Sequence, residues 1–373
     1  MSGARPRARD LGVPLDGTPG SWNAITDVRG VEVGHVTLVT GQGRLVEGEG
    51  PVRTGVSAIH PRGKGDPDPV FAGWFALNGN GEMTGTAWIE DSGFLSGPVL
   101  ITNTHSVGVV RDAVVAWMHD RHGGFRWALP VVAETYDGLL SDINGHHVTR
   151  DHAFQALDDA AAGPVPEGNV GGGTGMICHG FKGGIGTASR VIDAAAGGHR
   201  VGVLAQCNHG SRRELRIGGV PVGRAITDLL PGQGPGGGFV ADGEATGIAG
   251  AGSIIAVVAT DAPLLPHQLR QVARRAALGV GRVGGVGESS SGDIFLAFST
   301  ANAGAARPEG VRRVAMLPNE RIDPVYLATV QAVEEAIVNA LVAAETMAGA
   351  AGLTVHALPH DRLREVLKSH GRL

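Results

Sequence analysis

Cysteine and aromatic residues are scarce in this chain. Of 373 residues, two are cysteines, Cys178 and Cys207, and 4% are aromatic. Two cysteines cannot form the disulfide framework of a small secreted domain, and they fit a reducing compartment. The few aromatic side chains also argue against a surface on which nucleic-acid bases stack.

Dense runs of lysine and arginine are missing as well. The formal net charge is -5 at pH 7, so the sequence offers no electrostatic footprint for a phosphate backbone or an anionic bilayer. The N-terminal segment carries basic residues without the apolar stretch of a secretory signal. The uncharged stretch 247–260 is shorter than the roughly 20 residues of a membrane-spanning helix. We expect a cytoplasmic protein with neither nucleic acid nor membrane as partner.

Glycine, by contrast, is abundant. The chain has 61 glycines, more than twice the usual share of about 7%. No G-X-Y period accompanies them, which excludes collagen. The glycines are therefore expected in turns and where backbone segments approach closely.

Apolar β-branched runs alternate with segments of helical periodicity, which predicts layers of sheet and helix. Predicted strands cover residues 31–39, 52–59, 70–77, 127–133, 201–206, 254–260, 294–299 and 311–317. Predicted helices cover residues 107–119, 149–162, 266–279 and 361–369, and a further helix begins at Asp323 with Pro324 and ends before Gly349.

The segment 231–238, PGQGPGGG, has the composition of a linker. The part of the chain that follows opens with an apolar strand whose faces would be uncovered if this part folded alone. We therefore interpret the segment as a loop inside a single domain.

The segment 247–261, GIAGAGSIIAVVATD, places Ser253 after small residues and directly before an apolar strand. This arrangement suits an N-terminal nucleophile. The Ser253 hydroxyl attacks the Gly252 carbonyl, and cleavage frees an α-amine, with an ordinary pKa of about 8, that can act as general base. The alternative from the spacing alone is a serine that simply starts a strand.

Two further polar clusters adjoin predicted strands. In GESSSGD, residues 287–293, Ser291 and Asp293 lie two apart, so an extended segment would present them on one face to orient a nucleophile. In QCNHG, residues 206–210, Asn208 can donate amide hydrogens to an oxyanion. The alternatives are a polar turn at the first cluster and a zinc site at the second, although no C-x-x-C spacing supports zinc.

Two more segments end or follow strands. In ETYD, Glu134 can bind a substrate ammonium and Tyr136 can help an oxyanion; the alternative is a solvated turn. The glycine-rich stretch 168–190 invites a phosphate-loop interpretation, but Lys182 follows Phe181 and no Ser or Thr follows it, so the spacing fails. Curvature around a different active site explains these glycines better.

Taken together, these segments resemble the DmpA-like L-aminopeptidase/D-amidase-esterase family, which includes the β-aminopeptidases. The resemblance runs through nearly the whole chain in nine ordered motifs. They are SWNAITDVRGVEVGHVTL, NGNGEMTG, ITNTHSVG, VVAETYDGLLSDING, GNVGGGTGM, QCNHGSRRELRIGGVPVG, GSIIAVVATDAPLLPHQL, SSSGD and EEAIVNALVAAETM.

The resemblance implies an α/β fold: a four-layer αββα sandwich similar to N-terminal-nucleophile hydrolases but differently connected. It implies self-cleavage between Gly252 and Ser253 into chains 1–252 and 253–373. The family roles then fall on Ser253 as nucleophile, Ser291 and Asp293 as its supporting pair, Asn208 and Tyr136 as oxyanion stabilisers, and Glu134 as the anchor for the substrate amino group.

The same resemblance implies no metal or cofactor and a homo-oligomer, a tetramer of processed units. The expected substrates are small peptides, amino-acid amides and amino-acid esters with a free amino group. Aspartate at position 293 favours α-amino substrates, because the β-aminopeptidases are expected to carry glutamate there. The alternatives are an acyltransferase similar to ornithine acetyltransferase, which Ser253 disfavours since threonine is expected there, and an inactive fold that acts as a binding protein.

Overall fold

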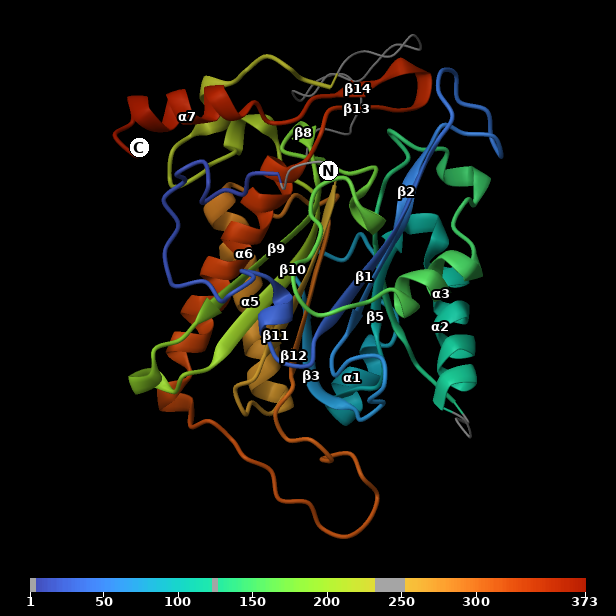
Figure 1. Cartoon of the computed structure of the whole chain (residues 1–373), viewed down its shortest axis with the longest axis vertical. Coiled ribbons are helices and arrows are strands. Elements are labelled where there is room, and N and C mark those ends of the chain that lie inside the picture. The colour runs from blue at the N-terminus through green and yellow to red at the C-terminus, as the bar shows by residue number, and fades with distance from the viewer. Residues whose placement is uncertain (1–4, 123–126, 232–251) are drawn as a thin grey trace.

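Two β-sheets lie face to face at the centre of the computed structural model, which describes residues 5–122, 127–231 and 252–373 (Figure 1). The six-stranded sheet has the order β4 (Phe94–Leu95), β3 (Val70–Ala76), β12 (Gly292–Ser299), β11 (Ser253–Thr260), β10 (Arg200–Asn208) and β9 (Gly184–Val191). The four-stranded sheet has the order β1 (Glu32–Thr40), β2 (Val52–His60), β5 (Val99–Asn103) and β6 (Val131–Thr135). Each sheet contains one parallel pair, β11 with β12 and β5 with β6, and its other pairs are antiparallel.

Helices cover the outer faces of both sheets. Helices α5 (Pro266–Val283) and α6 (Asp323–Ala343) pack on the six-stranded sheet, and α2 (Val107–His122) and α3 (Arg150–Asp158) pack on the four-stranded sheet (Figure 1). A separate core of aliphatic residues fills the space between the sheets. Burial of both faces explains why most strands are nearly continuous in apolar residues. The predicted four-layer αββα sandwich is confirmed.

Smaller elements complete the chain. They are α1 (Thr86–Ser92), α4 (Val222–Ala225), α7 (His360–Ser369), the hairpin of β7 (Ile177–Cys178) with β8 (Phe181–Lys182), and that of β13 (Met347–Ala348) with β14 (Thr354–Val355). Short 3-10 helices lie at Ile25–Asp27, Thr104–Ser106, Ile143–Gly145, Gly171–Gly173, Ala194–Ala196, Arg212–Glu214, Asn319–Arg321 and Ala350–Gly352.

The strand predicted at residues 311–317 is wrong. This segment belongs to the long loop that follows β12 and has no regular structure (Figure 1). Val311 is 96% exposed, and the Ala315 amide donates to the side chain of Asn302 rather than to a strand. Its other backbone bonds also go to loop residues: Asn302 Nδ2 donates to the Ala315 carbonyl, and the Leu317 amide donates to the Pro263 carbonyl.

The strand predicted at residues 127–133 begins later, at Val131, because Trp127 is exposed and Pro130 precedes the ladder. Strands β5 and β9 were not predicted. The sequence of β9, GIGTASRV, looks like a loop, but Gly186 lies directly beneath α6. A Cβ added there would lie 1.9 Å from the carbonyl oxygen of Ala336. Glycine therefore permits close sheet–helix packing at this position.

Helix α6 is long and apolar enough to span a membrane by length and composition alone. In this fold it packs beside α5 on the six-stranded sheet, against β9 and β10, and most of its side chains are buried. Its Glu335 carboxylate, also buried, pairs with Arg190 at 2.7 Å and Arg9 at 2.9 Å. These contacts are those of a core helix of a folded domain.

The loop predicted at residues 231–238 lies, apart from Pro231, outside the described residues. On its far side, β11 pairs with β10 along its whole length. The chain after residue 252 therefore completes a sheet that the earlier part begins.

Candidate active site

Ser253 is the first residue of β11, between two neighbouring strands. It lies opposite Asn208, the last residue of β10, and opposite Gly292, the first residue of β12. The Ser253 side chain is buried, and its Oγ accepts a hydrogen bond of 3.1 Å from the Gly292 amide. The same amide donates to the Gly252 carbonyl oxygen at 3.3 Å. One backbone N–H therefore contacts both the predicted nucleophile and the carbonyl of the predicted cleavage site.

Gly252 is required by close packing. A Cβ added to this residue would lie 2.1 Å from the Asn208 carbonyl oxygen and 3.0 Å from the Asn208 carbonyl carbon. Real Cβ contacts are longer, so any side chain here would push β10 and the start of β11 apart. The Gly252–Ser253 bond is thus held tightly against the end of β10.

Ser291 and Asp293, predicted to act as a pair, are in direct contact. The Ser291 hydroxyl donates to Asp293 Oδ1 at 2.5 Å, which is the short distance expected for a hydroxyl bonded to a carboxylate. The Asp293 carboxylate also accepts from the Ile254 amide and from Asn78 Nδ2, each at 3.3 Å. Asp293 therefore joins Ser291 to the residue that follows Ser253.

The side chain of Asn208 is fixed by two hydrogen bonds. Its Oδ1 accepts from the Ile177 amide at 2.8 Å, and its Nδ2 donates to the Tyr136 carbonyl oxygen at 3.0 Å. These partners define which end of the amide is nitrogen. Because Nδ2 carries two hydrogens, one remains for another acceptor.

Tyr136 contributes to this arrangement through its backbone. Its side chain is 46% exposed, and its hydroxyl makes no hydrogen bond within the described residues. The phenol lies against Gly138, where an added Cβ would be 2.4 Å from the hydroxyl oxygen. Partial burial, together with the charge of Asp137, raises the pKa of the phenol.

Glu134 reaches the site from the facing sheet. It lies on β6 and is buried; its carboxylate accepts a 2.9 Å hydrogen bond from the Glu82 amide and another from the Thr104 hydroxyl. A Cβ added to Gly81 would lie 3.2 Å from Glu134 Oε1 and 3.1 Å from Gly292 Cα. Glu134 is therefore separated from the start of β12 only by the backbone of Gly81. Burial raises the pKa of its carboxyl group, partly offset by the two hydrogen bonds.

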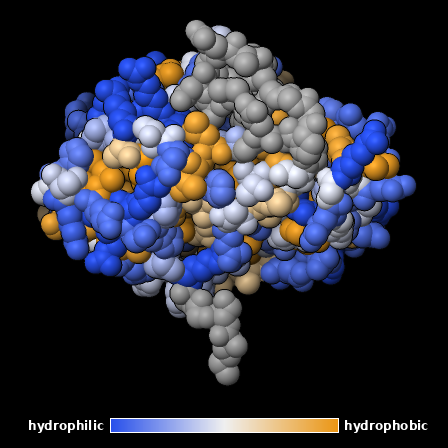
Figure 2. All heavy atoms as spheres, turned by 90° about the horizontal axis from the view of Figure 1, so that it is seen from above, coloured by the Kyte–Doolittle hydropathy of each residue, from blue (hydrophilic) through white to orange (hydrophobic). Residues whose placement is uncertain are grey.

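The structure thus places five of the six predicted side chains together in one network at one end of the sheets. The sixth residue, Tyr136, joins this network through its backbone carbonyl. Asn78, Gly81, Thr104 and Gly292 join them, although the residue patterns did not single them out. The first three lie in the motifs NGNGEMTG and ITNTHSVG, whose only signal was their part in the family resemblance. Figure 2 looks onto this end of the sandwich, where hydrophobic residues are interspersed with hydrophilic ones.

Asp137 lies behind the site, and its carboxyl group should make the stability of the protein depend on pH. It is fully buried and accepts hydrogen bonds from Asn103 Nδ2 at 3.0 and 3.3 Å, and burial raises the pKa of its carboxyl group to about 7. The folded state therefore binds more protons than the unfolded state between about pH 4 and pH 7, so stability contributed by this group is lost as pH rises through that window.

Asp137→Asn cannot ionise, so the variant should escape this loss. Relative to wild type, its free energy of unfolding should improve between about pH 5 and about pH 8 by up to about 3 kcal/mol, because roughly two pKa units of the shift are lost over this range. Urea unfolding at both pH values measures this difference. A constant gap between wild type and variant across the window would contradict the assignment.

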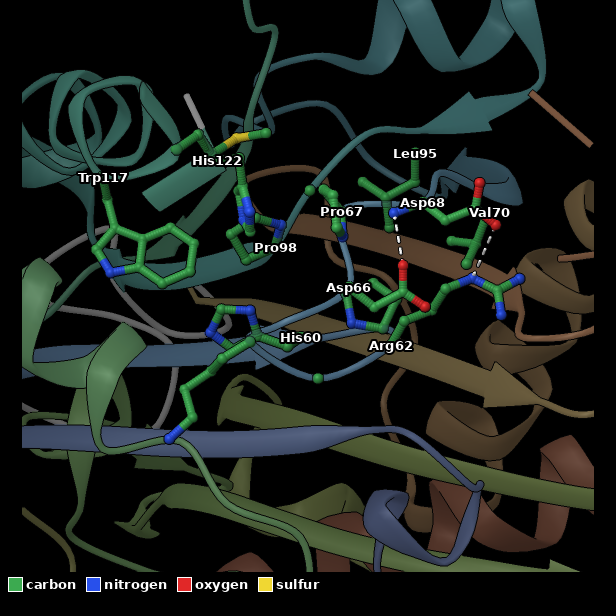
Figure 3. Close-up of a pocket in the computed structure, with 15 residues that line it drawn as sticks. His60, Arg62, Asp66, Pro67, Asp68, Val70, Leu95, Pro98, Trp117 and His122 are labelled. Atoms are coloured by element: carbon green, nitrogen blue, oxygen red, sulfur yellow. Dashed lines mark hydrogen bonds and ion pairs between the residues drawn. The ribbon is translucent and has the colours of Figure 1, made fainter. Parts of the chain in front are cut away.

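A pocket at the opposite end of the sheets, where β2 ends and β3 and β5 begin, can be set aside as a substrate site. Figure 3 shows it lined by His60, Trp117 and His122, with an ion pair between Arg62 and Asp68 at 3.8 Å. Its volume is about 20 Å³, enough for about one water molecule. None of the residues in the Ser253 network lines it.

Comparison with known proteins agrees with this geometry. The chain is 56% identical over 371 residues to β-peptidyl aminopeptidase BapA of Sphingosinicella microcystinivorans, covering 99% of this chain and 93% of that protein. The structure of the L-aminopeptidase D-Ala-esterase/amidase of Ochrobactrum anthropi, described as a new variant of the Ntn hydrolase fold, matches with a TM-score of 0.90 at 51% identity, covering 99% of this chain and all of that one. A β-aminopeptidase of Burkholderia sp. matches with a TM-score of 0.87 at 48% identity, covering 98% and 99%.

A family model for these enzymes covers most of the chain. The model of peptidase family S58 matches residues 23–355, a range that includes every residue of the network around Ser253. With the relatives above, this match settles the assignment: the chain belongs to peptidase family S58.

Proposed function

We propose that this protein is a self-processing serine aminopeptidase that also hydrolyses amino-acid amides and esters, with Ser253 as its nucleophile. Aminopeptidase and amidase-esterase activity is what the similar proteins are named for. The observation that carries the choice of nucleophile is the position of Ser253 at the start of β11. It lies between Asn208, at the end of β10, and the N–H of Gly292, at the start of β12.

Self-processing begins on the Gly252 carbonyl. The Ser253 hydroxyl adds to this carbon, the C–N bond to Ser253 breaks, and the nitrogen takes the proton, which leaves an ester between Gly252 and Ser253 Oγ. The Gly292 N–H already donates to the carbonyl oxygen on which negative charge develops. Water then hydrolyses the ester and releases the Gly252 carboxylate and the Ser253 amine and hydroxyl.

Turnover uses the amine that processing creates. It takes the proton of Ser253 Oγ as this oxygen attacks the substrate carbonyl, and it returns the proton to the leaving amine. The free Nδ2 hydrogen of Asn208 and the Gly292 N–H are the donors for the oxyanion, and Tyr136 is proposed as a further donor. Ser291 and Asp293 hold the start of β11. Water resolves the acyl-enzyme, and an amine in its place forms a new peptide bond.

Glu134 is proposed to bind the substrate ammonium, and substitution of Glu134 tests the proposed function directly. Glu134→Gln keeps the shape but removes the charge, so kcat/KM for amino-acid p-nitroanilides should fall about 10–100-fold, the value of a charged hydrogen bond. Since burial raises the pKa of Glu134, kcat/KM of the wild type should also fall as pH drops through that pKa, because the protonated acid cannot pair with an ammonium.

Glu82→Gln is the matched control. Glu82 gives Glu134 a backbone N–H, and its own side chain is exposed, so this variant should retain nearly wild-type kcat/KM. Equal losses in both variants would contradict the role of Glu134. Processed wild-type protein that cleaves no p-nitroanilide, amide or ester would overturn the proposed function; transfer of an acetyl group from acetylornithine to glutamate would then favour the acyltransferase alternative.

Substrate preference and assembly are part of the proposal. Relatives named for β-peptides and for L-amino acids are similarly close, so matched α- and β-amino p-nitroanilides are the substrates to compare; we propose a preference for α-amino substrates on the basis of Asp293. We further propose a cytoplasmic homotetramer of processed units without a catalytic metal or cofactor. Native mass measured after processing tests the tetramer.

A further inference from the structure

A second polar cluster lies directly behind Asn208. Cys178 ends β7, His179 follows it, and His209 follows Asn208 at the end of β10. The three residues each offer one ligand atom, and these atoms all lie within 4.8 Å of one another. All three side chains are buried, and no step of the proposed reaction uses them.

The hydrogen bonds of His179 show which of its ring nitrogens carries a lone pair. Nδ1 lies 2.9 Å from the carbonyl oxygen of Ser211, which can only accept, so Nδ1 carries the proton. Nε2 is then a bare acceptor, and it is buried without a hydrogen-bond partner in the described part of the chain. A histidine that donates one ring N–H to a backbone carbonyl and keeps its other nitrogen free has the arrangement found around metal-bound histidines.

His209 and Cys178 supply the other two groups. Nδ1 of His209 lies 3.9 Å from the Cys178 sulfur, and its Nε2 is also buried without a partner in the described ranges. The cluster thus combines one thiol with two imidazoles, and one ring nitrogen of each imidazole has no partner in the described ranges.

We propose that Cys178, His179 and His209 bind one zinc ion that ties the β7–β8 hairpin to the end of β10. Thiolate and neutral imidazole are the usual zinc ligands. Zinc bonds of about 2.0–2.3 Å place tetrahedral ligand atoms about 3.3–3.6 Å apart, so the side chains have to close in by about an ångström. The ion is structural: it holds the strand end that carries Asn208, and it takes no part in the chemistry at Ser253.

This site departs from the expectation drawn from spacing. No C-x-x-C motif is present, and the two cysteines and their neighbouring histidines lie about 30 residues apart in the sequence. The pairing of the His179 amide with the His209 carbonyl at 2.7 Å brings the two segments together. Sequence separation therefore concealed a cluster that the fold assembles.

The test is metal content of the full-length protein. Wild type, Cys178→Ser and His267→Asn are incubated with zinc ions alone, dialysed and analysed by inductively coupled plasma mass spectrometry; His267 is an exposed histidine on α5 and serves as the matched control. We expect about one zinc per chain in wild type and His267→Asn, and about a tenth of that or less in Cys178→Ser. Zinc should raise the melting temperature of wild type but not of Cys178→Ser.

A cobalt spectrum keeps the test independent of how the variants fold. Cobalt bound to wild type should show thiolate-to-metal charge transfer in the near ultraviolet, which requires the Cys178 sulfur as a ligand. Wild type that retains no zinc, or retains as much as Cys178→Ser, would overturn the proposal and leave Cys178 and His209 as a simple hydrogen-bonded pair. Cys207→Ser should keep its zinc; loss of zinc from this variant at an unchanged melting temperature would overturn the three-residue assignment.

Discussion

Replacing Ser253 with alanine should leave the chain whole and inactive. The wild type should separate under denaturing conditions into chains of 252 and 121 residues, the smaller one beginning at Ser253. The variant has no hydroxyl to attack the Gly252 carbonyl, and without cleavage it also lacks the α-amine that acts as base. Both processing and turnover are lost together, so activity on amino-acid p-nitroanilides should fall by about 10⁴-fold or more.

Intact-mass analysis with N-terminal sequencing measures the first effect, and initial rates measure the second. Ser290→Ala is the matched control: Ser290 lies in the SSSGD motif, but its side chain is exposed and its carbonyl oxygen accepts from Asn80 Nδ2. This variant should be cleaved and active like wild type. A Ser253→Ala protein that still yields two chains would exclude Ser253 as the agent of cleavage.

Asn208→Asp should lower kcat by about 10²–10³-fold with a much smaller change in KM, the usual loss when one oxyanion donor is removed. Aspartate retains the shape and still offers an oxygen to the Ile177 amide. It replaces the Nδ2 hydrogens, one of which is bonded to the Tyr136 carbonyl, with a negatively charged oxygen beside the developing oxyanion. Processing at Gly252 should slow as well, since the end of β10 that carries Asn208 packs against Gly252.

Two measurements separate this effect from misfolding. The variant loses the hydrogen bond to the Tyr136 carbonyl, so its melting temperature should fall, and a single cooperative unfolding transition is the sign that the fold is intact. Both kcat and KM should be determined on protein that has finished processing. A wild-type kcat in the Asn208→Asp variant would contradict the role of Asn208 as an oxyanion donor. A rise in KM with unchanged kcat would assign Asn208 to substrate binding instead.

Local patterns predicted those parts of the site that lie along a single strand. The start of β11 and the start of β12 were predicted nearly to the residue, because apolar runs begin there after glycine and polar residues. The contact between Ser291 and Asp293 follows from the two-residue period of a strand. What these patterns do not contain is which strands become neighbours.

Glu134 shows this limit. Its carboxylate approaches Gly292 across the interface between two sheets, by way of the backbone of Gly81, and nothing in the spacing of 81, 134 and 292 encodes that approach. The missed strand β9 has a different cause: its glycines suit a helix that packs closely above them, and that helix lies about 150 residues further along the chain. In both cases the deciding partner is distant in sequence.

The order of strands in the six-stranded sheet also decides what cleavage can release. Strands β12 and β11, which lie after the predicted cut, are inserted between β3 and β10, which lie before it. Every hydrogen bond on the outer sides of β11 and β12 therefore joins one product chain to the other. Separation would require opening the middle of the sheet, not peeling off an edge. A purification tag on either terminus should thus recover both pieces from native solution, and pieces from two different molecules should not exchange without denaturant.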